Sequence, residues 1–251
     1  MAEPVLIEIC VDSLASAIAA ERGGAARVEL CSSLTDGGVT PSAGMIEAVR
    51  SKISIGLQVI IRPRGGDFCY EQEEFEIMRK DILAAKARGA DGVVLGILDP
   101  NGNVDVGRAR ELVMLARPMN VTFHRAFDVS ADLFRALEDV SSTGANRLLT
   151  SGGEQNCVLG AETIAKLIKL ARGRITIMAG RGIDESNAAS IIERTGVSEI
   201  HVGTGTYGAR PVIYGNRRIS MGKHRGGEYQ RMEVLEENVR KLKRAVSLVS
   251  G

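Results

Sequence analysis

The segment Gly144-Ala145-Asn146-Arg147-Leu148 joins a glycine, a short link and the start of an apolar run. Three other segments repeat this pattern: Gly24-Ala25-Ala26-Arg27-Val28, Gly89-Ala90-Asp91-Gly92-Val93 and Gly196-Val197-Ser198-Glu199-Ile200. Glycine readily adopts the left-handed conformation that ends many helices, so each segment predicts a helix followed by a strand. The intervals between the segments leave room for two strand–helix units each, which predicts eight units in all.

Short apolar runs lie where this spacing requires strands, and segments of helical periodicity separate them. The predicted strands are Leu6 to Val11, Arg27 to Cys31, Leu57 to Ile61, Gly92 to Leu95, Val121 to His124, Arg147 to Thr150, Ile175 to Ala179 and Glu199 to Val202. Strict alternation favours parallel strands, and eight equivalent units without a smaller domain favour closure. We therefore predict an α/β protein built as a single (β/α)8 TIM barrel over residues 1–251. The Gly-rich and Arg-rich segment from Gly203 to Arg231 is expected to cover the barrel mouth.

The amino-acid composition and net charge limit the kinds of binding partner that are expected. The 251 residues are 44% hydrophobic and 25% charged, and 32 Lys and Arg balance 31 Asp and Glu to a net charge of +1. This balance gives no electrostatic reason to expect a nucleic acid or a membrane as partner, so a small ligand is expected. No signal-type or membrane-length apolar segment is present in the sequence, and the four cysteines form no Cys-x-x-Cys pair. A cytoplasmic protein with reduced thiols is the prediction.

Period-two alternation predicts a polar barrel interior. The apolar positions of each strand must face the helices, so the alternate positions point inward. The inward set comprises Glu8, Cys10, Glu29, Cys31, Gln58, Ile60, Arg62, Thr122, His124, Glu199 and His201. A scaffold barrel would fill these positions with aliphatic residues, because unpaired buried charges are costly. The interior is either a ligand-binding or catalytic site or a purely structural network of ion pairs.

Cys10 and Cys31 end neighbouring strands in matching Glu-x-Cys contexts, so their thiols are expected to converge. Two soft thiolates would suit Cu(I). The alternative is that both cysteines pack as small buried hydrophobes.

A second group of candidates follows the fifth strand in Phe123-His124-Arg125-Ala126-Phe127-Asp128. His124 is expected to act as a general base or a ligand, or else to complete a hydrogen-bond network in the core. Arg125 and Asp128 would then contribute to substrate binding at the carboxyl end of the strand.

Several loops favour an anionic ligand. Arg62 and Arg64 leave the third strand beside a glycine pair, and the guanidinium fork matches carboxylate or phosphate, although a solvated surface turn is the alternative. Polar and Gly-rich runs also follow the last three strands, where barrels often bind phosphate. The candidates in these runs are Thr150, Ser151, Gly152, Gly180 and Gly182, and a further run is Gly203-Thr204-Gly205.

These motifs together resemble the CutC family. The resemblance rests on Glu8-Ile9-Cys10-Val11-Asp12-Ser13, Arg27-Val28-Glu29-Leu30-Cys31, Gly37-Gly38-Val39-Thr40-Pro41-Ser42, Ile61-Arg62-Pro63-Arg64-Gly65-Gly66-Asp67-Phe68, the run from Phe123 to Asp128, and Leu149-Thr150-Ser151-Gly152. It implies a barrel fold, a cytoplasmic location, a homo-oligomer (dimer or tetramer) and a role in copper tolerance. The Cu(I) ligands proposed for eukaryotic members would correspond to Cys10 and Cys31.

Two functions are therefore expected. One is copper homeostasis through Cu(I) bound by Cys10 and Cys31. The other is catalysis on a small phosphorylated or carboxylated metabolite, with Glu8, Glu29, His124 and His201 in acid–base roles and the arginines and glycine loops holding the anion. No motif fixes a reaction, so whether the chain is an enzyme stays open, as does a third role as an oligomer that presents surface loops to partners.

Overall fold

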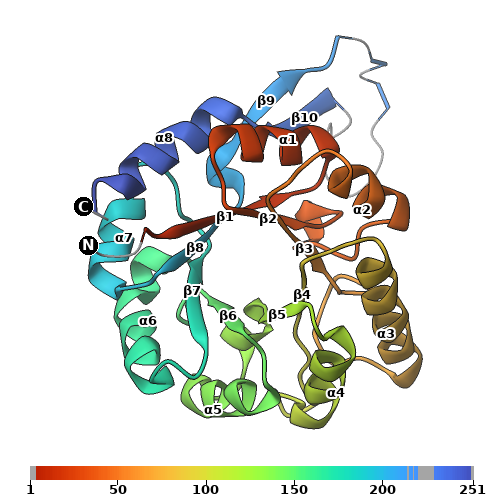
Figure 1. Ribbon diagram of the computed structural model, residues 1–251, viewed down its shortest axis with the longest axis vertical. Helices are drawn as coiled ribbons and strands as arrows, with labels where there is room; N and C mark the ends of the chain where they lie inside the picture. Colours follow the sequence, from red (N-terminus) through yellow and green to blue (C-terminus); the bar gives the residue numbers. More distant parts are fainter. Residues whose placement is uncertain (1–3, 214, 217, 220–228, 250–251) are drawn as a thin grey trace.

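Eight parallel strands form a closed barrel in the computed structural model, surrounded by helices (Figure 1). The structure describes residues 4–213, 215–216, 218–219 and 229–249. The barrel strands are β1 (Leu6–Val11), β2 (Arg27–Leu30), β3 (Gly56–Ile60), β4 (Gly92–Leu95), β5 (Asn120–Phe123), β6 (Arg147–Thr150), β7 (Thr176–Gly180) and β8 (Glu199–Val202). They agree with the predicted strands to within one residue at each end. The predicted TIM-barrel fold is thus confirmed.

The helices run back along the outside of the barrel, as parallel strands require. They are α1 (Leu14–Gly23), α2 (Ala43–Arg50), α3 (Gln72–Ala87), α4 (Val106–Ala116), α5 (Leu133–Thr143), α6 (Cys157–Ala171), α7 (Ala188–Thr195) and α8 (Glu236–Ser247), with short 3-10 turns η1 (Leu34–Asp36), η2 (Arg125–Val129) and η3 (Thr204–Thr206). Gly24, Gly144 and Gly196 end α1, α5 and α7 with φ values of 92°, 86° and 76°. These left-handed caps confirm the interpretation of the repeated glycine segments.

The register of the strands brings the two ends of the chain together at one side of the barrel. β1 pairs with both β2 and β8, with Cys10 opposite Glu29 and Glu8 opposite His201. The main apolar core lies between the strands and the helices, whereas Cys10, Cys31, Ile60 and Val94 form a small separate cluster. The inward orientation predicted for the two cysteines agrees with this separation.

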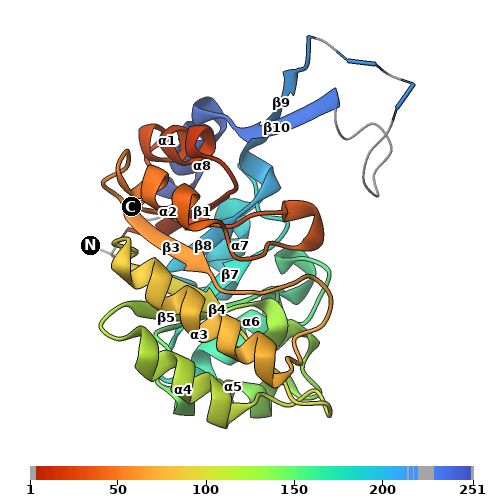
Figure 2. The same ribbon diagram turned by 90° about the vertical axis from the view of Figure 1, so that its right-hand side faces the viewer.

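The segment after β8 differs from the expectation that it covers the barrel mouth. β9 (Tyr207–Pro211) and β10 (Gln230–Val234) pair as an antiparallel ribbon that extends away from the barrel beyond α1 and α8 (Figure 2). Among the described residues of this segment, those at its start, Gly203 to Gly205, border the mouth cavity described below. The two strands pair with each other, while the base of the ribbon packs on the barrel through Tyr207 and Val234, which belong to the main apolar core. Part of the predicted covering segment lies outside the described residues.

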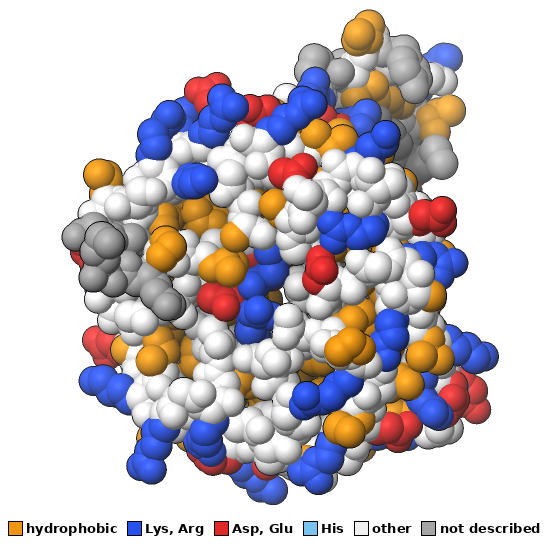
Figure 3. Space-filling model, viewed as in Figure 1, with side chains coloured by type: hydrophobic (Ala, Val, Ile, Leu, Met, Phe, Trp, Pro, Cys, Tyr) orange, Lys and Arg blue, Asp and Glu red, His pale blue; other side chains and the backbone are white. Residues whose placement is uncertain are grey.

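The surface shows no single-sign field on the face seen in Figure 3, which is the amino-terminal end of the barrel. Acidic and basic side chains are interspersed around its rim. Within the described residues, no helix has both the length and the apolar character that crossing a bilayer requires.

Candidate functional site at the barrel mouth

A cavity of about 380 Å³ opens at the carboxyl ends of the strands. Residues from β1, β2, β3 and β8 and from the loops after β3, β5 and β7 contribute to its walls. Those with chemically active side chains are Cys10, Glu29, Asp36, Arg62, His124, Arg125, Arg181 and His201. Apolar walls alternate with these polar groups, a pattern typical of a small-molecule site.

The two predicted thiols meet at this cavity. The Sγ atoms of Cys10 and Cys31 lie 3.8 Å apart, and both cysteines are free thiols. Cys10 borders the cavity, while Cys31 is fully buried behind it with its Sγ 3.5 Å from the carbonyl oxygen of Val11. The hydrogen bond with Cys31 raises the pKa of Cys10 well above its ordinary value, and burial and the nearby Glu29 carboxyl act in the same direction. Cys10 is therefore a protonated thiol at neutral pH.

A buried charge network lies directly beneath the thiols. Glu8 is fully buried, accepts a hydrogen bond from Arg27 Nε, and lies with its Oε1 2.7 Å from Nδ1 of His201. Arg27 also reaches Glu199, with Nη2 2.5 Å from Oε2. Burial alone would raise the pKa of Glu8, but the His201 hydrogen bond and the Arg27 charge outweigh it and lower the pKa to about 2. Glu8 is thus an anion that orients the imidazole of His201.

Glu29 and His201 face each other across the cavity floor. Their Oε2 and Nε2 atoms are 3.8 Å apart. Burial raises the pKa of Glu29, against the opposing effect of the His201 charge. The pKa of His201 is raised as well, because the Glu29 and Glu8 carboxylates outweigh its own burial. Two carboxyls that touch one imidazole therefore have pKa values shifted in opposite directions.

Three side chains here offer metal ligands within 4.8 Å of one another: Cys10, Glu29 and His201. The hydrogen bond from Nδ1 to Glu8 leaves Nε2 of His201 facing the cluster, which is the arrangement of a carboxylate that supports a histidine ligand. Cys31 adds a second sulfur beside Cys10. The sulfur and imidazole donors suit Cu(I), and the harder Glu29 carboxylate does not belong to that set. The sequence prediction missed His201 as a neighbour of the thiols, although closure of a barrel necessarily places the eighth strand beside the first.

Arg62 and Arg64 have most of their hydrogen-bonding capacity committed to protein groups. Arg62 Nη1 donates to the carbonyls of Asp36 (2.8 Å) and Gly38 (3.0 Å), and Nη2 donates to Gly66 (2.8 Å). Arg62 still borders the cavity. Arg64 instead binds Glu74, with Nε 2.5 Å from Oε1, and is not among the residues that line the cavity.

His124 lies at the end of β5 and is 95% buried, with 5% relative exposure. Its Nδ1 accepts a hydrogen bond of 3.1 Å from the N–H of Ala126, while Nε2 has no partner among the described residues. Burial and the positive charges of Arg62 and Arg125 lower the pKa of His124 to about 3. The imidazole is therefore neutral and borders the cavity as a hydrogen-bond donor through Nε2.

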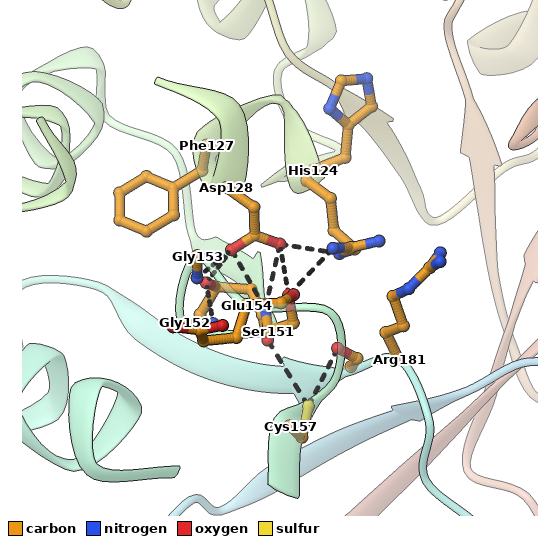
Figure 4. Close-up of polar contacts among 12 residues, drawn as sticks. His124, Phe127, Asp128, Ser151, Gly152, Gly153, Glu154, Cys157 and Arg181 are labelled. Carbon is orange, nitrogen blue, oxygen red and sulfur yellow. Dashed lines mark hydrogen bonds and ion pairs between the residues drawn. The ribbon is translucent and has the colours of Figure 1, made fainter. Parts of the chain in front are cut away.

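Asp128 anchors the loop after β6 (Figure 4). Its carboxylate accepts hydrogen bonds from Thr150 Oγ1 (2.5 Å), from the hydroxyl and N–H of Ser151, from the N–H of Gly153 (3.0 Å), and from Arg125 Nε (2.7 Å). Such a fully used carboxylate stabilises the loop. Its own oxygens are occupied within the protein.

The structure thus divides the predicted substrate-binding residues into two groups. Arg62, Arg125 and Gly182 border the cavity with Glu29, His124 and His201, whereas the remaining predicted positions do not. The positions outside the lining are Arg64, Asp128, Thr150, Ser151, Gly152 and Gly180. Gly180 has no side chain, and Leu149 and His201 pack closely against it where a Cβ would lie. Its carbonyl accepts a hydrogen bond of 2.9 Å from the Cys157 thiol.

The cavity lining also includes residues that the sequence did not single out as site candidates, notably Arg181 and Phe68. Arg181 has a left-handed φ of 88°, and its Nε donates to the carbonyl of Gln155 (2.8 Å). In the run Ala179-Gly180-Arg181-Gly182, the sequence prediction named the two glycines as candidates for anion binding. The arginine between them was the signal from which Arg181 could have been predicted as well.

Comparison with known proteins agrees with the geometry. The model of the CutC family matches residues 5–206. A CutC family protein of Xylella fastidiosa (strain 9a5c) is 47% identical over 246 residues, covering 96% of this chain and 88% of that protein. The human copper homeostasis protein cutC homolog is 44% identical over 217 residues, covering 86% of this chain and 80% of that protein.

Solved structures give the same result. The crystal structure of a copper homeostasis protein CutC from Streptococcus agalactiae has a TM-score of 0.74 at 34% identity, and the match covers 79% of this chain and 98% of that one. Thiamine phosphate pyrophosphorylase from Pyrococcus furiosus has a TM-score of 0.61 at 16% identity, with 98% of each chain covered, which is a likeness of fold alone. The family model and the relatives cover most of the sequence, and the chain belongs to the CutC family.

Proposed function

We propose that this chain binds one Cu(I) ion through Cys10 and Cys31 at the barrel mouth, as part of copper homeostasis. The observation that carries the proposal is the 3.8 Å separation of the two Sγ atoms beside the cavity. Two sulfurs this close need only a small adjustment to share one ion, and Cu(I) favours low coordination by soft sulfur. The names of the human and mouse relatives, which are copper homeostasis protein cutC homologs, support the same role.

Binding would be coupled to proton release. Both cysteines must lose their protons to act as ligands, and the raised pKa of Cys10 makes this step costly near neutrality. His201 offers a third donor, because Glu8 holds its Nδ1 and leaves Nε2 toward the thiols. Affinity for Cu(I) should accordingly increase as the pH rises.

The proposal includes a reducing cytoplasmic setting and a homo-oligomer. The four cysteines are free thiols, as Cu(I) coordination requires, and reduced cysteines are the rule in the cytoplasm. Cell fractionation and light scattering of the purified protein test the location and the assembly.

The test is a Cu(I) titration of the reduced protein against a competing chelator. Cys10→Ser and Cys31→Ser should each weaken Cu(I) binding by at least about 100-fold, because a hydroxyl is a poor ligand for a soft ion. Cys69→Ser is the matched control, since Cys69 is a free thiol that does not border the cavity. Equal affinities in all four proteins would refute the proposal.

A second candidate function is acid–base catalysis on a small metabolite. The observation that favours it is the opposite shift of two carboxyl pKa values around His201, with Glu8 at about 2 and Glu29 raised. Such a pair can provide an anion and a proton donor in one site. A screen for metabolite turnover with wild type and Glu29→Gln tests it: the variant should lose activity while Cu(I) affinity stays within a few-fold of wild type.

A further inference from the structure

Two buried N–H groups at the mouth cavity lack an acceptor. Nε of Arg62 and Nε2 of His124 have no hydrogen-bond partner in the described part of the chain, although each residue is 95% buried, with 5% relative exposure. Both side chains border the cavity and lie against the ring of Phe68. The Arg62 Cζ atom is 4.9 Å from the centre of this ring, and the centre of the His124 ring is 5.0 Å from it. Buried donors are nearly always paired, so two orphans in one place indicate a missing acceptor.

The surrounding contacts hold both donors in place. Three backbone carbonyls hold the Arg62 guanidinium through its two Nη atoms, which leaves Nε without a hydrogen-bond partner among the described residues. The backbone N–H of Ala126 is necessarily a donor, so Nδ1 of His124 is the acceptor and the ring proton resides on Nε2. The imidazole lies directly against Gly96, which follows β4, in the space that a Cβ at this position would occupy.

The charges around the cavity favour an anion. Arg62, Arg125 and Arg181 all border it, against the acidic residues Glu29 and Asp36. Asp36 already accepts a hydrogen bond of 2.5 Å from the Ser33 hydroxyl. Arg125 is already ion-paired with Asp128 at 2.7 Å, so the Arg62 and Arg181 guanidinium groups supply the positive charge that attracts a carboxylate or phosphate into this partly enclosed, low-dielectric space.

We infer that the cavity binds the oxyanion group of a small metabolite, with an oxygen accepting hydrogen bonds from Arg62 Nε and His124 Nε2. The body of the ligand would lie against the apolar wall of Ile60, Leu149 and Ile183. The volume of about 380 Å³ holds a molecule larger than inorganic phosphate. The donors come from the β3 and β5 side of this cavity, whereas the thiols come from β1 and β2, and of the two thiols Cys10 borders the same cavity.

The chain's few histidines make NMR a direct test. The sequence contains three, and the imidazole Cε1–H signal of His124 is assigned as the one that His124→Phe removes. Inorganic phosphate and acetate are added separately to metal-free protein. A bound anion should shift this signal saturably at neutral pH, because the Nε2–H of His124 then donates to a charged oxygen. The anion with the lower Kd identifies phosphate or carboxylate as the head group.

Variants locate the site. Arg181→Ala, at an exposed position that leaves the barrel intact, should weaken anion binding about three- to tenfold, in line with loss of one charge-assisted contact. Arg194→Ala is the matched control, because Arg194 lies on α7 outside the cavity lining. All these measurements use metal-free protein, so an anion response of the wild-type chain supports this inference whether or not the chain binds Cu(I). The inference is overturned if neither anion shifts the His124 signal, or if Arg194→Ala weakens binding as much as Arg181→Ala.

Discussion

Asp128 and Glu29 are acidic residues on opposite sides of the same barrel mouth, and their surroundings differ sharply. Asp128 accepts hydrogen bonds from five donors supplied by Arg125, Thr150, Ser151 and Gly153. Glu29 has the Cys10 thiol beside it and His201 Nε2 at 3.8 Å, and burial raises its pKa. The first carboxylate is stabilised by its neighbours, while the second is held in a site that disfavours its charge.

These two carboxyl groups distinguish the part of the mouth that stabilises the fold from the part that remains available for chemistry. A group with all its hydrogen bonds made inside the protein has little left for a ligand. The side of the mouth formed by β1, β2, β3, β5 and β8 keeps unsatisfied donors and shifted pKa values, which cluster at functional sites. The loop after β6, which Asp128 holds in place, therefore stabilises the mouth, and the other side of the mouth remains available to bind a ligand.

The largest expected loss of stability comes from removing the Asp128 carboxylate, which accepts hydrogen bonds from its neighbours within the protein. Asp128→Ala should lower the free energy of unfolding by about 3–5 kcal/mol, because it leaves several buried donors without an acceptor. Urea unfolding followed by circular dichroism measures the loss. Glu185→Ala is the control, an exposed acidic residue on the same side of the barrel, and should change stability by less than about 0.5 kcal/mol. A similar small change for Asp128→Ala would contradict the comparison.

An intermediate effect is expected from removing one donor instead of the acceptor. Arg125→Ala should cost about 1–2 kcal/mol, since Asp128 keeps its hydroxyl and backbone donors and the arginine is 30% exposed. Thermal unfolding of the variant beside Asp128→Ala provides the measurement. If the two variants were equally destabilised, the arginine would be the main partner and the backbone donors would contribute little.

The smallest expected change in stability comes from replacing Glu29, on the other side of the mouth. Glu29→Gln should change stability by less than about 1 kcal/mol at neutral pH, because the buried carboxylate lacks strong partners there. Its raised pKa means that the folded protein holds this proton more tightly than the unfolded chain does. The stabilisation is complete below the ordinary value of 4.5 and is lost as the pH rises through the folded-state pKa.

Wild type should therefore lose stability relative to Glu29→Gln as the pH increases from about 4.5 toward neutrality. Urea unfolding of both proteins across this range gives the difference at each pH. Parallel pH profiles for the two proteins would show that Glu29 has no raised pKa in the folded state.

Most of the fold was predictable because its signals are local. Glycine caps at Gly24, Gly144 and Gly196 mark where helices end, and period-two alternation marks the strands. The same alternation correctly predicted that Cys10 and His201 border the barrel interior. The direction of the β9–β10 ribbon was not predictable, because its strands pair with each other and its apolar contacts with the core, through Tyr207 and Val234, fix only its base.

The details of the site depend on contacts between distant segments. Arg62 and Arg64 are equivalent in sequence, yet one is fixed by carbonyls of the loop after β2 and the other by Glu74 at the start of α3. Likewise, Glu8 and Glu29 occupy matching Glu-x-Cys motifs but have opposite pKa shifts, because only Glu8 lies against Arg27 and Nδ1 of His201. No local pattern encodes these differences.

The pairing of β1 with β8 also has a consequence for the order of events on the ribosome. Cys10 and Cys31 emerge early in synthesis, while His201 follows only after most of the chain has been made. A nascent chain therefore presents two thiols before the imidazole, and the three groups come together only after β8 has been made and has paired with β1. Under the copper proposal, the early chain would offer an ion sulfur alone, and the folded barrel would add the histidine.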